Sequence, residues 1–75
     1  MSEYAFVIGS MDDYDSLEEL RAAADPAAEP PPFVSIFRFQ VPDGLDEETI
    51  TMIGRGYAFS NGWGEDHTFS FLVEC

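Results

Sequence analysis

The sequence predicts a small α+β domain in the order β-α-β-β-β, with a mainly antiparallel sheet and one helix packed on one face. Apolar residues alternate with others in three separate segments, which is the period of a half-buried strand. One further segment has helical spacing behind a capping signal. A chain of 75 residues is long enough for a single domain, which we place at residues 1–75.

The clearest strand signal covers residues 33–41, which we expect to form the central strand. One side of this segment is apolar apart from Ser35, and it carries Phe33, Phe37, Phe39 and Val41. Val34 and Ile36 lie on the opposite side. We expect a monomer or a weak homodimer, and these two residues would support the homodimer if that side is open to solvent.

Residues 4–8 alternate in the same way and predict a short first strand. Ser16 and Glu19 then form the pattern of a capping box, and acidic residues near it suit the start of a helix. Asp25 precedes a proline, which disfavours helical geometry and ends the helix there. Residues 27–32 are rich in proline and predict a stiff, extended connector.

After a turn at residues 42–44, the chain allows two interpretations. A helix beginning at Asp46 suits the apolar spacing of residues 45–53. The β-branched residues around Ile50, followed by Gly54 and Gly56, favour a strand over residues 49–59, with helical turns limited to 45–48. We predict the strand.

Residues 60–66 are dense in turn formers, and Asn61-Gly62 is a strong hairpin signal. Trp63 in this turn either folds over the core or anchors an interface, and we favour the core. The last strand is expected over residues 67–74, and its inward-facing residues are Phe69, Phe71 and Val73.

The charge balance is the outstanding feature of the composition. Fifteen acidic residues face three arginines and no lysine, which gives a net charge of −12. The negative electrostatic field of such a charge disfavours nucleic acid and anionic membranes as partners and favours a basic protein surface. Neither a secretion signal nor a membrane-spanning segment is apparent, so we expect a soluble, cytoplasmic protein.

No residue pattern predicts catalysis, a metal site or a cofactor. His67 and Cys75 are the only members of their types, which leaves no zinc ligand set. The acids that begin at Asp12 lack the ligand spacing and the glycine of a calcium-binding loop. We therefore expect a binding protein rather than an enzyme.

The acidic residues are clustered along the chain, and their clusters are the candidate partner-binding site. On the expected helix, Asp15 and Glu19 are one turn apart, so their side chains lie about 5–6 Å from each other. The elongated array is similar in character to the closely spaced phosphates of a duplex. Its ten candidate residues are Asp12, Asp13, Asp15, Glu18, Glu19, Asp25, Asp43, Asp46, Glu47 and Glu48.

With its small size, its clusters at residues 12–15 and 43–48 and its lack of lysine, the chain resembles the small acidic inhibitors encoded by phages. These include anti-CRISPR proteins and DNA mimics that act against restriction enzymes. The resemblance implies an inhibitor that occupies the DNA-binding surface of a host nuclease or CRISPR complex in the host cytoplasm. It does not assign a role to any single residue.

Two other interpretations share the acidic composition. An acidic binding or regulatory module, such as an antidote for another basic protein, has the same charge but fits a pocket rather than a DNA groove. A halophilic protein of unrelated function is also acid-rich, but its acids coat the whole surface evenly. The clustering of the acids favours the inhibitor.

Overall fold

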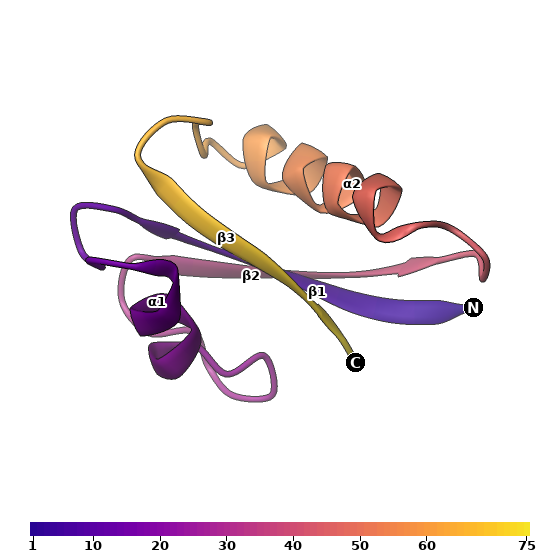
Figure 1. The fold of residues 1–75 in the computed structure, drawn as a ribbon, viewed down its shortest axis with the longest axis horizontal. Coiled ribbons are helices and arrows are strands. Elements are labelled where there is room, and N and C mark those ends of the chain that lie inside the picture. Colours follow the sequence, from indigo (N-terminus) through magenta and orange to yellow (C-terminus); the bar gives the residue numbers. More distant parts are fainter.

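The computed structural model describes residues 1–75 and contains three strands and two helices (Figure 1). The fold is α+β with the order β-α-β-α-β, and the sheet is antiparallel throughout. The predicted order β-α-β-β-β is therefore wrong in its fourth element. The elements are β1 (Ser2–Ser10), α1 (Leu17–Ala23), β2 (Val34–Val41), α2 (Glu47–Ser60) and β3 (Thr68–Glu74).

The central strand is β1, which pairs with both β2 and β3 in the order β2-β1-β3. The expectation that residues 33–41 form the central strand is wrong, because β2 lies at an edge. Residues 5–9 of β1 are all buried, which requires cover on both faces of the strand. This segment is apolar at every position, and such continuous apolar runs are typical of strands buried on both sides.

Residues 47–60 form a helix rather than the predicted strand over 49–59. Asp46 caps the helix, because its carboxylate accepts a hydrogen bond of 3.0 Å from the backbone of Thr49. The residues that face the sheet follow at helical spacing, namely Ile50, Gly54 and Ala58. Burial of this face outweighs the weak strand preference of the β-branched residues.

The glycine that suggested a break in the helix instead lets it approach the sheet. A Cβ atom at Gly54 would lie 2.6 Å from ring carbons of Phe6, a separation that real side chains do not reach. The helix α2 therefore packs on β1 at a distance that only glycine permits. Gly56 faces open space, and a Cβ atom there would meet nothing within 4 Å.

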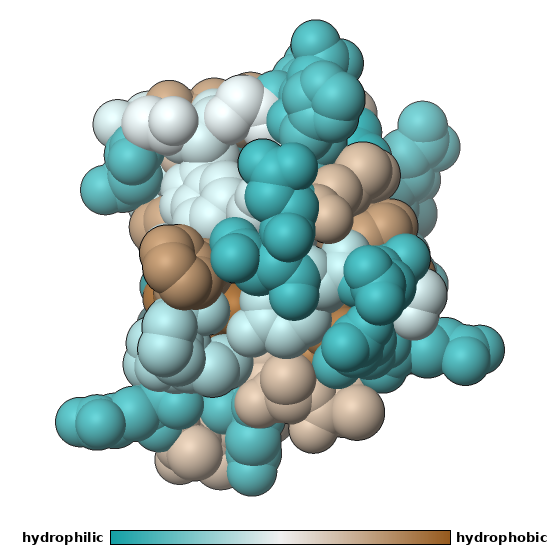
Figure 2. Space-filling view, turned by 90° about the vertical axis from the view of Figure 1, so that its left-hand side faces the viewer, coloured by the Kyte–Doolittle hydropathy of each residue, from teal (hydrophilic) through white to brown (hydrophobic).

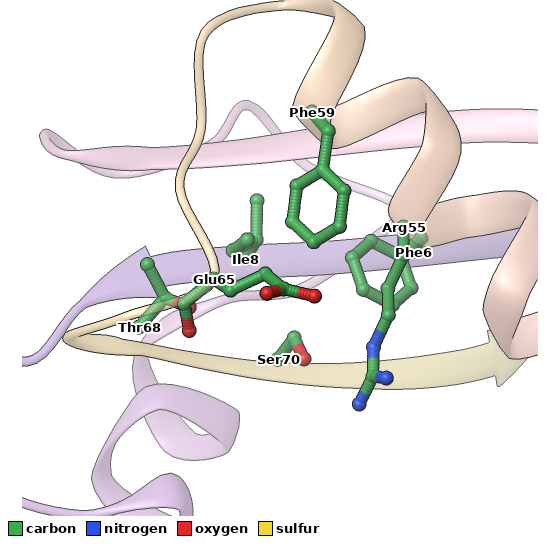
Figure 3. Close-up of a pocket in the computed structure, with 7 residues that line it drawn as sticks. All are labelled: Phe6, Ile8, Arg55, Phe59, Glu65, Thr68 and Ser70. Carbon is green, nitrogen blue, oxygen red and sulfur yellow. The ribbon is translucent and has the colours of Figure 1, made fainter.

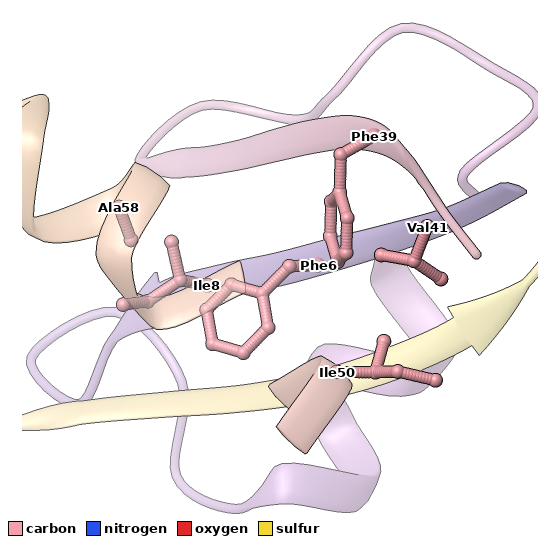
Figure 4. Packing of buried hydrophobic residues seen from close by; sticks show 6 residues of the cluster. All are labelled: Phe6, Ile8, Phe39, Val41, Ile50 and Ala58. Atoms are coloured by element: carbon pink, nitrogen blue, oxygen red, sulfur yellow. The ribbon is translucent and has the colours of Figure 1, made fainter. Parts of the chain in front are cut away.

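Each face of the sheet carries one helix and one apolar core, whereas the sequence predicted a single covered face. Under α2 lies a cluster that we call the α2 core, shown in Figure 4: Phe6, Ile8, Phe39, Val41, Ile50 and Ala58. Under α1 lies the α1 core, which comprises Val7, Leu20, Ala24, Val34 and Phe71. Val34 is buried there and Ile36 is half-buried against it, which removes the basis for a homodimer through these residues.

The start of α1 is confirmed, whereas the shape of its connector is not. Ser16 is the N-cap and accepts a hydrogen bond of 3.1 Å from the Glu19 backbone. The helix ends at Ala23, just before the Asp25-Pro26 step. Residues 27–32 were expected to be extended, but turns occur at residues 26–27 and 32–33, and Phe33 adopts a φ of 65° outside β2.

Asn61-Gly62 ends α2 and does not form the predicted hairpin turn. Gly62 has a φ of 96°, its N–H donates to the Phe59 carbonyl, and the next N–H donates to the Ala58 carbonyl. These two bonds are those of a Schellman motif. The motif turns Trp63 back over the α2 core, where its indole N–H donates to the Ser35 hydroxyl at 3.1 Å, so the core placement is confirmed.

The alternation along β3 places apolar residues on both faces. Phe69, Phe71 and Val73 belong to the α1 side, as members or neighbours of that core. Leu72, which was expected to face away from the core, packs against the α2 core instead. Thr68 and Ser70 lie on the same side as Leu72, and their small polar side chains leave space beneath α2.

Candidate partner-binding surface

The first group of candidate acids lies where β1 leaves the sheet and α1 begins. The loop is held by the Ser10 hydroxyl, which accepts a hydrogen bond of 3.1 Å from the Asp12 backbone. The Ser10 carbonyl accepts two further backbone bonds from Asp13 and Tyr14. These bonds fix the backbone and leave the carboxylates of Asp12 and Asp13 exposed and free of protein hydrogen-bond partners.

Two acids at the start of α1 differ in role although the sequence grouped them. Glu19 closes the helix start, because its carboxylate accepts a hydrogen bond of 3.0 Å from the Asp15 backbone. Asp15 precedes the cap and is not helical, so the two are joined by this bond rather than by one helical turn. The carboxylates of Asp15 and Glu18 are exposed and bond to no other protein group.

Glu65 and Asp66 join this group from the far end of the sequence. The backbone N–H of Met11 donates to the His67 carbonyl at 2.8 Å, and Ser10 pairs with Thr68 at the start of β3. The loop before β3 therefore lies beside the loop after β1. We call the free carboxylates here the acidic end, and they belong to Asp12, Asp13, Asp15, Glu18, Glu65 and Asp66.

Figure 2 looks on to this end of the molecule, where hydrophilic side chains stand out around a few apolar ones. The sequence prediction did not include Glu65 and Asp66 in the site. Only the antiparallel pairing of β1 with β3 brings these two residues to this end, and no local sequence pattern predicts that pairing. His67 lies one residue before β3, close to its predicted place at the start of the last strand.

The second group of candidate acids lies at the opposite end of the sheet, at the turn from β2 to α2. Val41 pairs with Ser2 there, whereas Val34 pairs with Gly9 at the other end. Ser2 and Gly9 are seven positions apart on β1, which is roughly 23 Å at the usual rise of about 3.3 Å per residue. The ten candidate acids therefore do not form one continuous array.

Several acids of the second group serve the fold. Asp43 accepts a hydrogen bond of 2.7 Å from the Ser2 hydroxyl and lies 3.5 Å from the terminal ammonium group. Asp46 caps α2, and the hydrogen bonds that it accepts from Thr49 hold the pKa of its carboxyl group below the ordinary value. Asp25 follows α1 and lies outside this group, and its carboxylate also serves the fold, because it accepts a hydrogen bond of 2.9 Å from the backbone of Ala27. Glu47 and Glu48 are exposed in the first turn of α2.

The negative potential at this second end acts on Tyr4. The pKa of its hydroxyl is raised, first by burial and then by the carboxylates that surround it. The closest of these is Glu74, which accepts a hydrogen bond of 3.3 Å from the Tyr4 hydroxyl. Glu47 and Asp43 act in the same direction. The carboxylates at this end thus act together on a neighbouring hydroxyl.

The three arginines compensate little of this charge. Arg38 lies 3.8 Å from Glu3 and donates to the carbonyl of Pro26. Arg21 lies over the ring of Phe71, 5.1 Å from its centre. Arg55, an exposed residue of α2, makes no ion pair. No group of three or more potential ligands is arranged to hold a metal ion, and neither helix meets the requirements of a membrane span.

No family model, curated protein or solved structure was found to match this chain.

Proposed function

We propose that this protein inhibits a basic DNA-binding protein by occupying the surface on which DNA would lie. The partner is a host nuclease or a CRISPR surveillance complex, and the protein acts in the host cytoplasm as phage-encoded inhibitors do. The interaction is one between proteins, and this chain binds no nucleic acid itself. The acidic end supplies the centre of the contact.

The observation that carries the proposal is that most carboxylates of this protein have no positively charged group of the same chain beside them. Thirteen of the fifteen carboxylates form no ion pair, since only Glu3 and Asp43 lie within reach of a cation. Carboxylates without a cationic partner hold counterions from the solution around them. A partner rich in lysine and arginine releases those counterions, which drives binding in the same way as for phosphates.

The dimensions of the molecule support the same proposal. The structure is 35 Å long and 23 by 19 Å across, and its net charge is −12. Averaged over the long axis, with the candidate acids gathered towards its two ends, this is one net charge for about every 3 Å, compared with roughly 1.7 Å in a duplex. The length is close to one turn of DNA, which is about 34–36 Å.

The acidic end is a better contact than the opposite end. Its six carboxylates all project without internal hydrogen bonds, so they are available to a partner. At the opposite end, Asp43 and Asp46 are held in local hydrogen bonds that stabilise the chain terminus and α2. A charge that already serves the fold contributes less to a partner.

The direct test is capture of bacterial DNA-binding proteins by the immobilised protein, followed by elution with duplex DNA. We expect the captured proteins to be released by duplex DNA and by rising salt, because both compete for the same basic surface. Adding the protein to a captured nuclease should also block DNA cleavage. Capture that duplex DNA does not reverse would contradict the proposal.

Two matched variants locate the contact. The first removes three charges from the acidic end: Asp12→Asn, Asp13→Asn and Glu18→Gln. The control removes three charges elsewhere: Glu29→Gln, Asp43→Asn and Glu48→Gln. We expect at least a tenfold loss of affinity for the captured partner in the first and a smaller loss in the control. Equal losses would show that the acidic end has no special part.

A further inference from the structure

Phe33 is the most exposed aromatic residue of the chain, with 68% of its surface open to solvent. The other two exposed aromatic residues still lie against the fold. The ring centre of Tyr57 is 5.5 Å from that of Phe39, and Phe59 lines the hollow beneath α2 (Figure 3). Phe33 belongs to neither core and pairs with no other ring. Its side chain therefore contributes little to the fold.

The backbone of Phe33 adopts a conformation that favours glycine. The N–H of Val34 donates to the carbonyl of Pro31 at 3.3 Å and closes a turn. Pro32 fixes a negative φ at the first central position, and Phe33 has a φ of 65° at the second, which defines a type II turn. Glycine or asparagine is usual at that second position, because a Cβ atom strains the left-handed conformation. The fold alone therefore favours a residue other than phenylalanine here, and such strain is concentrated at functional sites.

The turn that carries Phe33 lies at the acidic end. It leads directly into β2, whose first residue pairs with β1 at the end of the sheet where β1 turns towards α1. The hydroxyl of Tyr14 donates to the carbonyl of Pro32 at 3.5 Å, and Tyr14 stands between Asp13 and Asp15 in the chain. Figure 2, which looks on to this end, shows apolar side chains among the hydrophilic ones. An exposed ring thus shares this end with carboxylates that have no protein partner.

An exposed ring near free carboxylates suits an arginine side chain better than any other cation of a protein. The guanidinium group is planar, so its N–H groups can bond a carboxylate while its face stacks on an aromatic ring. The chain contains one such stacking pair, in which Arg21 lies 5.1 Å from the ring centre of Phe71. The ammonium group of lysine is more strongly hydrated and gains less from a ring. An anionic group would be repelled by a protein of net charge −12.

We propose that Phe33 anchors the contact with the basic partner. Its ring stacks on an arginine side chain of the partner, and a carboxylate of the acidic end bonds the same guanidinium group. The carboxylates attract any basic surface, whereas the ring selects arginine over lysine. Binding energy at interfaces is concentrated in a few such side chains, which the partner covers completely. The inference rests on the proposed function and names the side chain of the partner that is recognised.

The probes are two fluorescein-labelled peptides of equal charge, one of alternating arginine and glycine and one with lysine in place of each arginine. Phe33→Leu keeps an apolar side chain without the ring, and Phe33→Tyr keeps the ring. In an anisotropy titration, we expect Phe33→Leu to lose about fivefold in affinity for the arginine peptide and less than about twofold for the lysine peptide. Phe33→Tyr should stay within about twofold for both peptides. Unchanged affinity of Phe33→Leu for the arginine peptide, or equal losses for the two peptides, would overturn the proposal.

The stability of Phe33→Gly tests whether the ring serves the fold instead. Glycine relieves the strain at a φ of 65° and removes a side chain that is mostly exposed. We expect the melting temperature of this variant to equal or exceed that of the original protein, while its affinity for the arginine peptide falls as far as that of Phe33→Leu. A melting temperature lowered by more than about 5 °C, a substantial loss for a domain of this size, would show that the ring stabilises the fold and would overturn the proposal.

The same variants separate this inference from the proposed function. If a protein that duplex DNA releases is lost on neutralising the acidic end but is bound equally well by Phe33→Leu, the proposal for Phe33 fails and the proposed function stands. If Phe33→Leu selectively weakens binding of the arginine peptide but duplex DNA releases no captured protein, the proposed function fails and Phe33 remains part of a site for arginine.

Discussion

The two faces of the sheet use glycine in opposite ways to bring a helix close. On the α1 face the glycine belongs to the strand, because a Cβ atom at Gly9 would lie 2.8 Å from a methyl carbon of Leu20. On the α2 face the glycine belongs to the helix, and Gly54 lies against Phe6. In both cases a large apolar side chain fills the position where the other element has no side chain.

The difference between the faces lies in what each helix leaves uncovered. The short α1 buries one residue, Leu20, and leaves Ile36, Phe69 and Val73 on its face half-buried. The longer α2 buries three residues, yet leaves one hollow beside Thr68 and Ser70 and another beside Leu72 and Glu74. The comparison teaches that a longer helix buries more of its own residues without covering its whole face. On the α2 face, the small side chains of Thr68 and Ser70 leave the space that remains.

Truncation of the two central apolar side chains should have the largest effects and should rank the faces. We expect Phe6→Ala to lower the free energy of unfolding by about 4 kcal/mol and Leu20→Ala by about 3 kcal/mol, because both are fully buried and phenylalanine leaves the larger cavity. Urea denaturation followed by circular dichroism measures both values. A greater loss for Leu20→Ala would reverse the order of the two cores.

The close approach at Gly54 is tested by comparison with Gly56. Gly54→Ala should destabilise the protein by about 1–2 kcal/mol, because the added methyl group overlaps the Phe6 ring. Gly56→Ala should instead stabilise it by up to about 1 kcal/mol, because alanine favours the helix and meets open space. Thermal denaturation of both variants gives the two signs. The same sign for both would mean that α2 does not pack through Gly54.

The caps of the two helices should have smaller effects. Ser16→Ala removes the side-chain acceptor for the Glu19 N–H and should lower the free energy of unfolding by about 1 kcal/mol. Ser16→Asp keeps an acceptor and serves as the control, with stability close to that of the original protein at neutral pH. Guanidinium denaturation distinguishes the two. Loss of equal size in the aspartate variant would point to an effect other than capping.

The smallest expected effect is the pH dependence of the α2 cap, tested by replacing Asp46 with a residue that does not titrate. The folded-state pKa of Asp46 is lowered, so its contribution is present above the ordinary aspartate value of 3.8 and is lost as the pH falls through the folded-state pKa. Asp46→Ser keeps a cap that does not titrate. Its stability should therefore decrease less than that of the original protein below about pH 4. Parallel pH profiles of thermal stability for both proteins would contradict this assignment.

The sequence signals that predicted the structure correctly all act within a few residues. They are the alternation of the strands at both chain ends, the capping box of Ser16 and the end of α1 before Asp25-Pro26, and each depends only on residues close in the chain. The alternative helix start at Asp46 is a local signal of the same kind. Gly54 and Gly56 argue against that helix as long as their surroundings are unknown, so the sequence favours the strand.

Charge, strand periodicity and caps were thus determined by the sequence alone, since each follows from composition or from residues close in the chain. The tertiary structure decided that α2 is a helix, because burial against Phe6 outweighs a weak local preference for strand. It also divided the acids between two ends of the sheet and joined Glu65 and Asp66 to the first. These outcomes depend on which strands pair, and that pairing is settled by packing on both faces of β1.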